Sequence, residues 1–144
     1  MLTRIDHVGI ACRDLEEKIA FYESTFGLTV VSREMHEEQG VREAMLRVAG
    51  DITGGSYVQL LQPLTPDTPV GRFLERRGEG IHHVGYGVAN ITVALELIGA
   101  TGVRLLDARP RHGSMGASIA FLHPADIGGV LTELVQAPAG LSGT

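Results

Sequence analysis

The chain has 144 residues, of which 44% are hydrophobic and 20% charged, a composition typical of one globular domain that excludes a disordered protein. The net charge of −5 and the scattered arginines exclude a basic face for binding nucleic acid. Because the apolar runs are too short for a membrane span, no signal peptide is evident and Cys12 is the only cysteine, we expect a cytoplasmic protein.

The first half of the chain predicts a strand, a helix and three further strands. A strand is expected over residues 5–11, and Asp14 is a suitable N-cap for a helix whose apolar residues recur at a helical period. A glycine ends that helix before a strand over residues 28–31. Strands over residues 41–48 and 57–61 complete the module.

The second half repeats that order after a connector over residues 63–78, which is expected to hold a short helix around residues 70–76. Its helix is again preceded by a suitable N-cap, Asn90. The expected strand, helix and three strands lie at residues 81–87, 91–99, 103–106, 117–122 and 130–135.

The two halves form an internal repeat, in which His7 and His83 are separated by an offset of 76 residues (83 − 7). One βαβββ half cannot close a sheet alone, but two halves together can. We therefore predict an α+β fold in which two tandem βαβββ modules form one curved, open, mixed sheet around a metal site. The modules are expected at roughly residues 2–62 and 79–137 of a single domain, residues 1–144.

Four polar residues occupy matching or nearly matching positions of the two modules. His7 is equivalent to His83, and Gln59 nearly so to Glu133, each being a polar group in an apolar strand row. A buried carboxylate is costly unless something compensates it. Two imidazoles, an amide oxygen and a carboxylate suit a divalent ion with positions left for substrate oxygens, whereas a closed structural zinc site usually contains thiolates. We predict that these four residues bind a metal.

Glu43 departs from the repeat, because its counterpart is expected near Ser118, which is not acidic. If the strand of Glu43 lines the metal cavity, this carboxylate is a candidate general base. The alternative is a surface carboxylate paired with Arg42 or Arg47. His36 lies beside a loop and is expected to be solvated.

The segments that carry a family likeness are residues 5–11, 38–43, 58–61, 80–84, 121–124 and 129–134. Together they resemble the vicinal oxygen chelate (glyoxalase/bleomycin resistance/dioxygenase) superfamily and, within it, the methylmalonyl-CoA epimerase family, over residues 2–137. The resemblance implies an isomerase that interconverts (2R)- and (2S)-methylmalonyl-CoA by metal-assisted removal of the C2 proton through an enolate. The implied metal ligands are again His7, Gln59, His83 and Glu133. The implied acid–base residues are Glu43 and Glu133.

The resemblance also implies an acyl-CoA thioester substrate, a homodimer and one divalent metal ion, with Co²⁺ first and Mn²⁺, Ni²⁺ or Zn²⁺ as alternatives. Arg72, Arg109 and Arg111 could meet CoA phosphates, but no CoA contact is assigned. A glyoxalase-type or other metal-dependent enzyme of the same superfamily, acting on a different small substrate, stays open as the alternative. Gln59 as an extra ligand argues against an extradiol dioxygenase, and the complete ligand set argues against a non-catalytic binding module.

Overall fold

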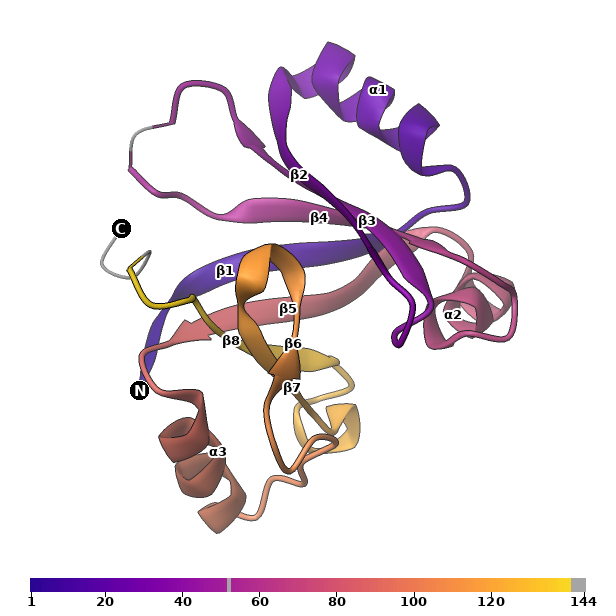
Figure 1. The fold of residues 1–144 in the computed structure, drawn as a ribbon. Coiled ribbons are helices and arrows are strands. Elements are labelled where there is room, and N and C mark those ends of the chain that lie inside the picture. Colours follow the sequence, from indigo (N-terminus) through magenta and orange to yellow (C-terminus); the bar gives the residue numbers. More distant parts are fainter. Residues whose placement is uncertain (52, 141–144) are drawn as a thin grey trace. The chain divides into compact units, whose positions relative to one another are not determined.

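The computed structural model describes residues 1–51 and 53–140, and within these residues the chain forms eight strands, three α-helices and two 3₁₀ turns (Figure 1). In chain order the elements are β1 (Leu2–Ala11), α1 (Leu15–Phe26), β2 (Leu28–His36), β3 (Val41–Val48), β4 (Tyr57–Pro63), α2 (Pro69–Arg77), β5 (Gly80–Val88), α3 (Ile91–Ala100), β6 (Arg111–His112), the turn Ser114–Gly116, β7 (Ser118–Leu122), the turn Pro124–Asp126 and β8 (Thr132–Gln136). The strands form a mixed sheet, with neighbours in the order β2-β3-β4-β1 in the first module and β5-β8-β7-β6 in the second. The predicted α+β class with two tandem βαβββ modules is confirmed, and α2 is the helix expected in the connector.

The prediction of a strand over residues 103–106 is wrong. Leu105 makes only an isolated bridge to Leu122, and the outer strand of this module is β6, two residues long, paired antiparallel with β7. Backbone hydrogen bonds still join this segment to residues 121–123, since the Arg104 carbonyl accepts the His123 N–H at 2.9 Å, but the Arg104 N–H donates to the Asp126 carboxylate at 2.9 Å. A carboxylate that accepts a backbone N–H offers the chain an alternative to strand pairing.

One compact unit comprises residues 7–82. In it β1 pairs in parallel with β4, and β2, β3 and β4 form an antiparallel meander. Helix α1 packs on this sheet through Leu15 and Ile19, which meet Leu46 and Leu60 in a buried cluster. Each such side chain contributes roughly 1.5–3 kcal/mol relative to an exposed one, so the helix is fixed by its apolar face.

The other compact unit comprises residues 1–6 together with the chain from residue 83 onwards. In it β5 pairs in parallel with β8, and β8 pairs antiparallel with β7. Helix α3 covers this sheet through Leu95, which belongs to a buried cluster with Leu122 and Leu134. The same architecture thus recurs, with one helix packed over one face of the four strands of its module.

The two equivalent helices begin at the N-caps that the sequence predicts. The Asp14 carboxylate accepts the Glu17 N–H at 3.1 Å, and the Asn90 amide oxygen accepts the Val93 N–H at 3.1 Å. Such a cap contributes about 1 kcal/mol by satisfying a backbone donor of the first helical turn. No helix in the described part of the chain is long and apolar enough to cross a membrane.

A pair of glutamines extends the repeat to side-chain hydrogen bonds. The Gln62 Oε1 atom accepts the Leu15 N–H at 2.7 Å, and the Gln136 Oε1 atom accepts the Ile91 N–H at 2.8 Å. Each bond ties the first residue of a helix to the closing strand of its own module. Gln62 and Gln136 are therefore structurally equivalent. Residues of the two closing strands correspond at an offset of 74 (136 − 62).

Cys12 is buried in the core of the unit formed by residues 7–82, with no exposed surface. Burial raises the pKa of its thiol from 9.0 to about 11, so the thiolate is about 100-fold less populated near neutral pH than an ordinary one (11 − 9.0). We expect native protein at pH 8 to resist a thiol-specific reagent and urea-unfolded protein to react fully. Absorbance of the released chromophore measures this, and rapid stoichiometric labelling of the native protein would show that Cys12 is accessible.

Candidate active site

Within the unit formed by residues 7–82, the predicted ligands His7 and Gln59 lie on the adjacent parallel strands β1 and β4, and both are buried. In the pairing of these strands, Gly9 lies beside Gln59. Gly9 is two residues after His7 and therefore lies on the same face of β1. Because glycine has no side chain, the row next to Gln59 is left open. The strand pairing therefore brings an imidazole and an amide to the same face of the sheet.

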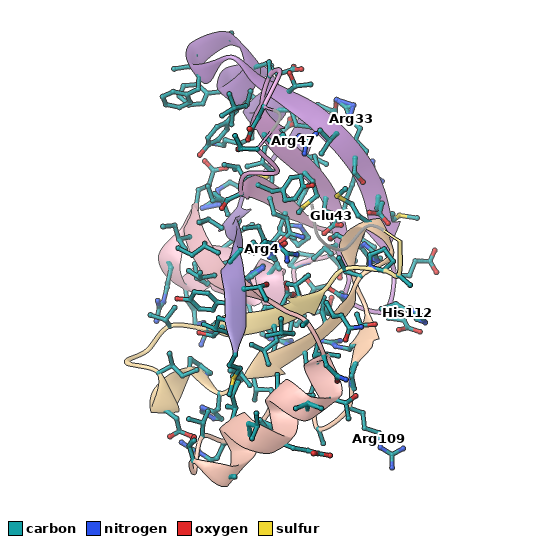
Figure 2. The ribbon with its side chains drawn as sticks, turned by 90° about the vertical axis from the view of Figure 1, so that its left-hand side faces the viewer. Arg4, Arg33, Glu43, Arg47, Arg109 and His112 are labelled. Carbon is teal, nitrogen blue, oxygen red and sulfur yellow. The ribbon has the colours of Figure 1, made fainter. Side chains whose placement is uncertain are left out.

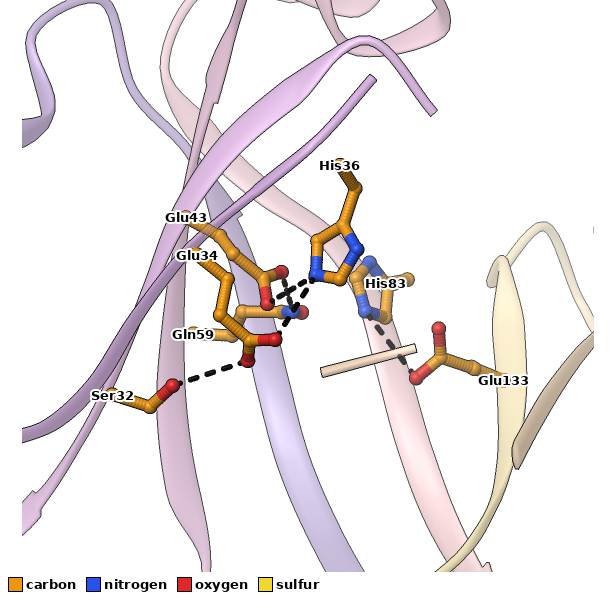
Figure 3. A network of polar contacts seen from close by, with 7 residues as sticks. All are labelled: Ser32, Glu34, His36, Glu43, Gln59, His83 and Glu133. Atoms are coloured by element: carbon orange, nitrogen blue, oxygen red, sulfur yellow. Dashed lines mark hydrogen bonds and ion pairs between the residues drawn. The ribbon is translucent and has the colours of Figure 1, made fainter. Parts of the chain in front are cut away.

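The other predicted pair, His83 and Glu133, shows the same arrangement in its own unit. Both side chains are buried, and Gly85 lies beside Glu133 as Gly9 lies beside Gln59. The His83 Nε2 atom is 4.0 Å from the Glu133 Oε1 atom (Figure 3). The rings of Phe121 and His83 pack edge to face, with 5.5 Å between their centroids, so one side of the imidazole contacts an apolar ring.

Glu43 on β3 is buried, with 2% of its surface exposed, and hydrogen bonds reach both of its carboxylate oxygens. The Gln59 Nε2 atom donates to Oε2 at 2.6 Å, and the His36 Nε2 atom lies 3.1 Å from Oε1 (Figure 3). A buried carboxylate that accepts such bonds is compensated for the water it loses. The structure therefore places Glu43 in the interior beside a predicted ligand, as the general-base hypothesis requires.

Two alternatives considered from the sequence are wrong. Glu43 is not a surface carboxylate paired with its neighbours, since Arg42 is exposed and the Arg47 guanidinium lies over the Tyr57 ring, 5.8 Å from its centroid. Strand alternation explains this result, because Arg42 points to the opposite face of β3 from Glu43. His36 is not simply solvated either: it ends β2 half-buried, with its imidazole turned to Glu43. The sequence offered one signal for it, the two-residue spacing of Ser32, Glu34 and His36.

The structural counterpart of Glu43 in the second module is Ile119 rather than Ser118. Glu43 lies opposite Leu61 on the closing strand of its module, and Ile119 lies opposite Val135 on the other. These two partners each precede an equivalent glutamine that binds the start of a helix. The offset of 76 residues between His7 and His83 also separates Glu43 from Ile119 (119 − 43), so the position expected near Ser118 is one residue away from the structural counterpart. The conclusion that Glu43 has no acidic twin still holds.

Three buried side chains, His7 in one unit and His83 and Glu133 in the other, each offer one atom of a type that binds metal ions. Two imidazole nitrogens and a carboxylate oxygen form a donor set that suits divalent transition metals. This group could hold a metal ion, although its donor types fit several ions equally well. Gln59 would offer its Oε1 atom to such an ion, because its Nε2 atom donates to Glu43.

The three arginines considered for CoA phosphates differ in their surroundings. The Arg72 guanidinium donates to the Asp67 carbonyl at 2.5 Å, and the Arg111 guanidinium lies 3.4 Å from the Asp107 carboxylate. Arg109 is exposed, and its side chain extends away from the strands (Figure 2). These positions assign none of the three to a CoA contact.

Comparisons with known proteins place the chain in a family. A model described as the glyoxalase/bleomycin resistance protein/dioxygenase superfamily matches residues 6–121. The chain is 37% identical over 137 residues to the mitochondrial methylmalonyl-CoA epimerase of Bos taurus, covering 94% of this chain and 75% of the relative. It is 35% identical over 138 residues to the ethylmalonyl-CoA/methylmalonyl-CoA epimerase of Cereibacter sphaeroides, covering 94% of this chain and 99% of the relative.

Solved structures agree with these relatives. A variant of Streptomyces coelicolor methylmalonyl-CoA epimerase, in complex with 2-nitronate-propionyl-CoA, is 51% identical, with 96% of this chain and 100% of that chain covered and a TM-score of 0.91. The likeness recognised in the sequence is thereby confirmed. The chain belongs to the glyoxalase/bleomycin resistance protein/dioxygenase superfamily, and its relatives within that superfamily include methylmalonyl-CoA epimerases.

Proposed function

We propose that this protein is a methylmalonyl-CoA epimerase, which interconverts (2R)- and (2S)-methylmalonyl-CoA by removing and replacing the proton at C2. The observation that carries the proposal is Glu43, a buried carboxylate held at both oxygens and absent from the equivalent position of the second module. A symmetric scaffold needs no such carboxylate, whereas proton abstraction next to a carbonyl does. The identity of 51% to an epimerase of known structure supports the substrate.

Glu43 is the proposed base on one face of the substrate. Its carboxylate takes the C2 proton on one Oε atom, while the hydrogen bonds from Gln59 and His36 keep the group oriented. Inversion requires proton exchange on both faces of C2, so a second group must return a proton from the other side. Glu133 is the proposed second group, buried on β8 beside His83. A carboxylate that also binds a metal is a weaker base, which makes Glu133 the slower partner of the two.

The proposed metal ligands are His7, Gln59, His83 and Glu133, all of which are buried. A divalent ion bound there would act as a Lewis acid that stabilises the negative charge developing on the substrate oxygens after proton loss. Co²⁺ is the proposed ion, and Mn²⁺, Ni²⁺ and Zn²⁺ are compatible with the same donors.

The proposal extends to a cytoplasmic homodimer that takes acyl-CoA thioesters. The buried Cys12 makes no disulfide, which suits a reducing compartment. Helix α3 exposes about half of the surface of Val93 and Leu97, and these apolar side chains support a contact between two copies of the chain. Light scattering coupled to gel filtration measures the molar mass, and a mass of one chain would contradict the dimer.

The test is deuterium exchange at C2. We expect metal-loaded protein, incubated in heavy water with either (2R)- or (2S)-methylmalonyl-CoA, to introduce deuterium at C2 and to invert the configuration, both followed by ¹H NMR. Absence of exchange by metal-loaded protein would overturn the substrate assignment. Ethylmalonyl-CoA is the informative second substrate, because a pocket discriminates one methylene by only about 10–200-fold.

A further inference from the structure

The second half of strand β2 carries three polar residues on its half-buried face, where apolar residues are usual. Its half-buried positions include Ser32, Glu34 and His36, whereas the large apolar Val31 and Met35 are exposed. Residues two apart on a strand share a face, so these three polar side chains point to the same side. A strand that turns polar groups inward and apolar groups outward breaks the pattern expected for stability alone.

Two carboxylates meet on this inner face. In the antiparallel pairing of β2 with β3, Glu34 lies directly opposite Glu43, and like charges at opposed positions destabilise a strand pair. The imidazole of His36 lies next to both, with Nε2 3.1 Å from the Glu43 Oε1 atom and 3.9 Å from the Glu34 Oε1 atom. The Ser32 hydroxyl donates to the other oxygen of Glu34 at 3.1 Å. His36 is thus placed to offset the repulsion between the two carboxylates.

The hydrogen bond to Glu43 raises the pKa of His36 above its ordinary value, and the charges of Glu43 and Glu34 act in the same direction, while burial opposes them. The imidazole therefore stays protonated to a higher pH than a solvated one and keeps an N–H that it can donate to Glu43. The ligand atoms of these three residues also lie within 4.8 Å of one another. The hydrogen bond between His36 and Glu43 and the ion pair between His36 and Glu34 account for that proximity without an ion.

We propose that His36 is a positioning residue for epimerisation, which holds the Oε1 atom of Glu43 while Gln59 holds Oε2, so that the carboxylate is presented to C2 in one orientation (Figure 3). This inference rests on the proposed function. His36 acts through Glu43 and does not itself touch the substrate. Such positioning has a measurable effect, because displacement of a reacting group by about 1 Å can cost about 100-fold in rate.

The test compares His36→Leu with His36→Gln, whose side-chain amide reaches about as far as the imidazole Nε2 and can donate the same hydrogen bond. We expect His36→Leu to lower kcat by about 100-fold with little change in KM, and His36→Gln to recover kcat to within about tenfold of the wild type. Met35→Leu, at the exposed neighbouring position on the opposite face of β2, is the matched control and should keep the wild-type rate.

Two further outcomes are distinguishable. An active wild-type protein whose His36→Leu variant turns over like Met35→Leu overturns the positioning role and leaves the proposed function intact. A wild-type protein that exchanges no deuterium at C2 overturns the proposed function and this inference with it. If His36→Leu does not fold, His36→Asn serves in its place, because its shorter amide cannot reach Glu43. Equal kcat values for His36→Asn and His36→Gln would then contradict the proposal.

Discussion

Replacement of Glu43 by glutamine is expected to lower the rate of epimerisation by about 10²–10⁴-fold, the range that a positioned general base contributes. The amide cannot accept the C2 proton, yet it has nearly the same size and can still meet Gln59 and His36, which now surround the carboxylate. The loss should therefore be chemical rather than structural. Steady-state kinetics with each epimer measures it, and a midpoint of thermal unfolding close to that of the wild type verifies the fold.

Deuterium exchange by the Glu43→Gln variant separates the two faces of the substrate. If Glu43 and Glu133 act on opposite faces, one epimer should lose its exchange while the other still exchanges through Glu133 and keeps its configuration. The metal content should stay unchanged, because Glu43 is not one of the proposed ligands. Equal slowing of exchange for both epimers would argue against two separate bases. Loss of the metal would instead make Glu43 a ligand.

The internal repeat explains why so much of this fold was predictable. Asp14 and Asn90 cap helices because each places an acceptor before an apolar helical period, which is a local signal. His7 and His83 could be paired by counting, since the strands that carry them begin the two modules. Positions late in each module are counted across loops of unequal length. The offset falls from 76 at His7 and His83 to 74 at Gln62 and Gln136 in the closing strands, whereas Glu43 and Ile119 still keep the offset of 76.

Strand β2 shows where local signals fail. The apolar pattern predicted a strand over residues 28–31, but the strand continues to His36. Its last part alternates polar and apolar residues in the reverse sense, because Glu34 and His36 face Glu43 rather than solvent. Only the pairing with β3 shows that these side chains meet a buried carboxylate. Functional constraint here outweighs the rule that apolar residues face inward, and that rule was the basis of the prediction.

Removal of divalent ions with a strong chelator, followed by dialysis, is expected to lower turnover by about 10³-fold. Lewis-acid stabilisation of developing charge contributes several kcal/mol, and about 4 kcal/mol corresponds to that factor. Co²⁺ should restore the rate, and titration with Mn²⁺, Ni²⁺ and Zn²⁺ ranks the ions that His7, His83 and Glu133 accept. Full turnover by protein shown by mass spectrometry to be free of metal would contradict the metal-assisted route.

The His83→Ala variant connects this loss to the proposed ligands. His83 is buried within 4.0 Å of Glu133, so its removal takes one donor from the group and leaves the carboxylate without its neighbour. We expect the metal content to fall together with turnover, and the stabilisation of the fold by added Co²⁺ to shrink. That stabilisation amounts to about 2.7 kcal/mol when the ion is at 100 times its Kd, which a thermal shift detects without any substrate. Glu43→Gln is the matched control, since it should lose turnover and keep the thermal shift. If both variants keep the shift, the ion binds elsewhere and the ligand assignment is wrong.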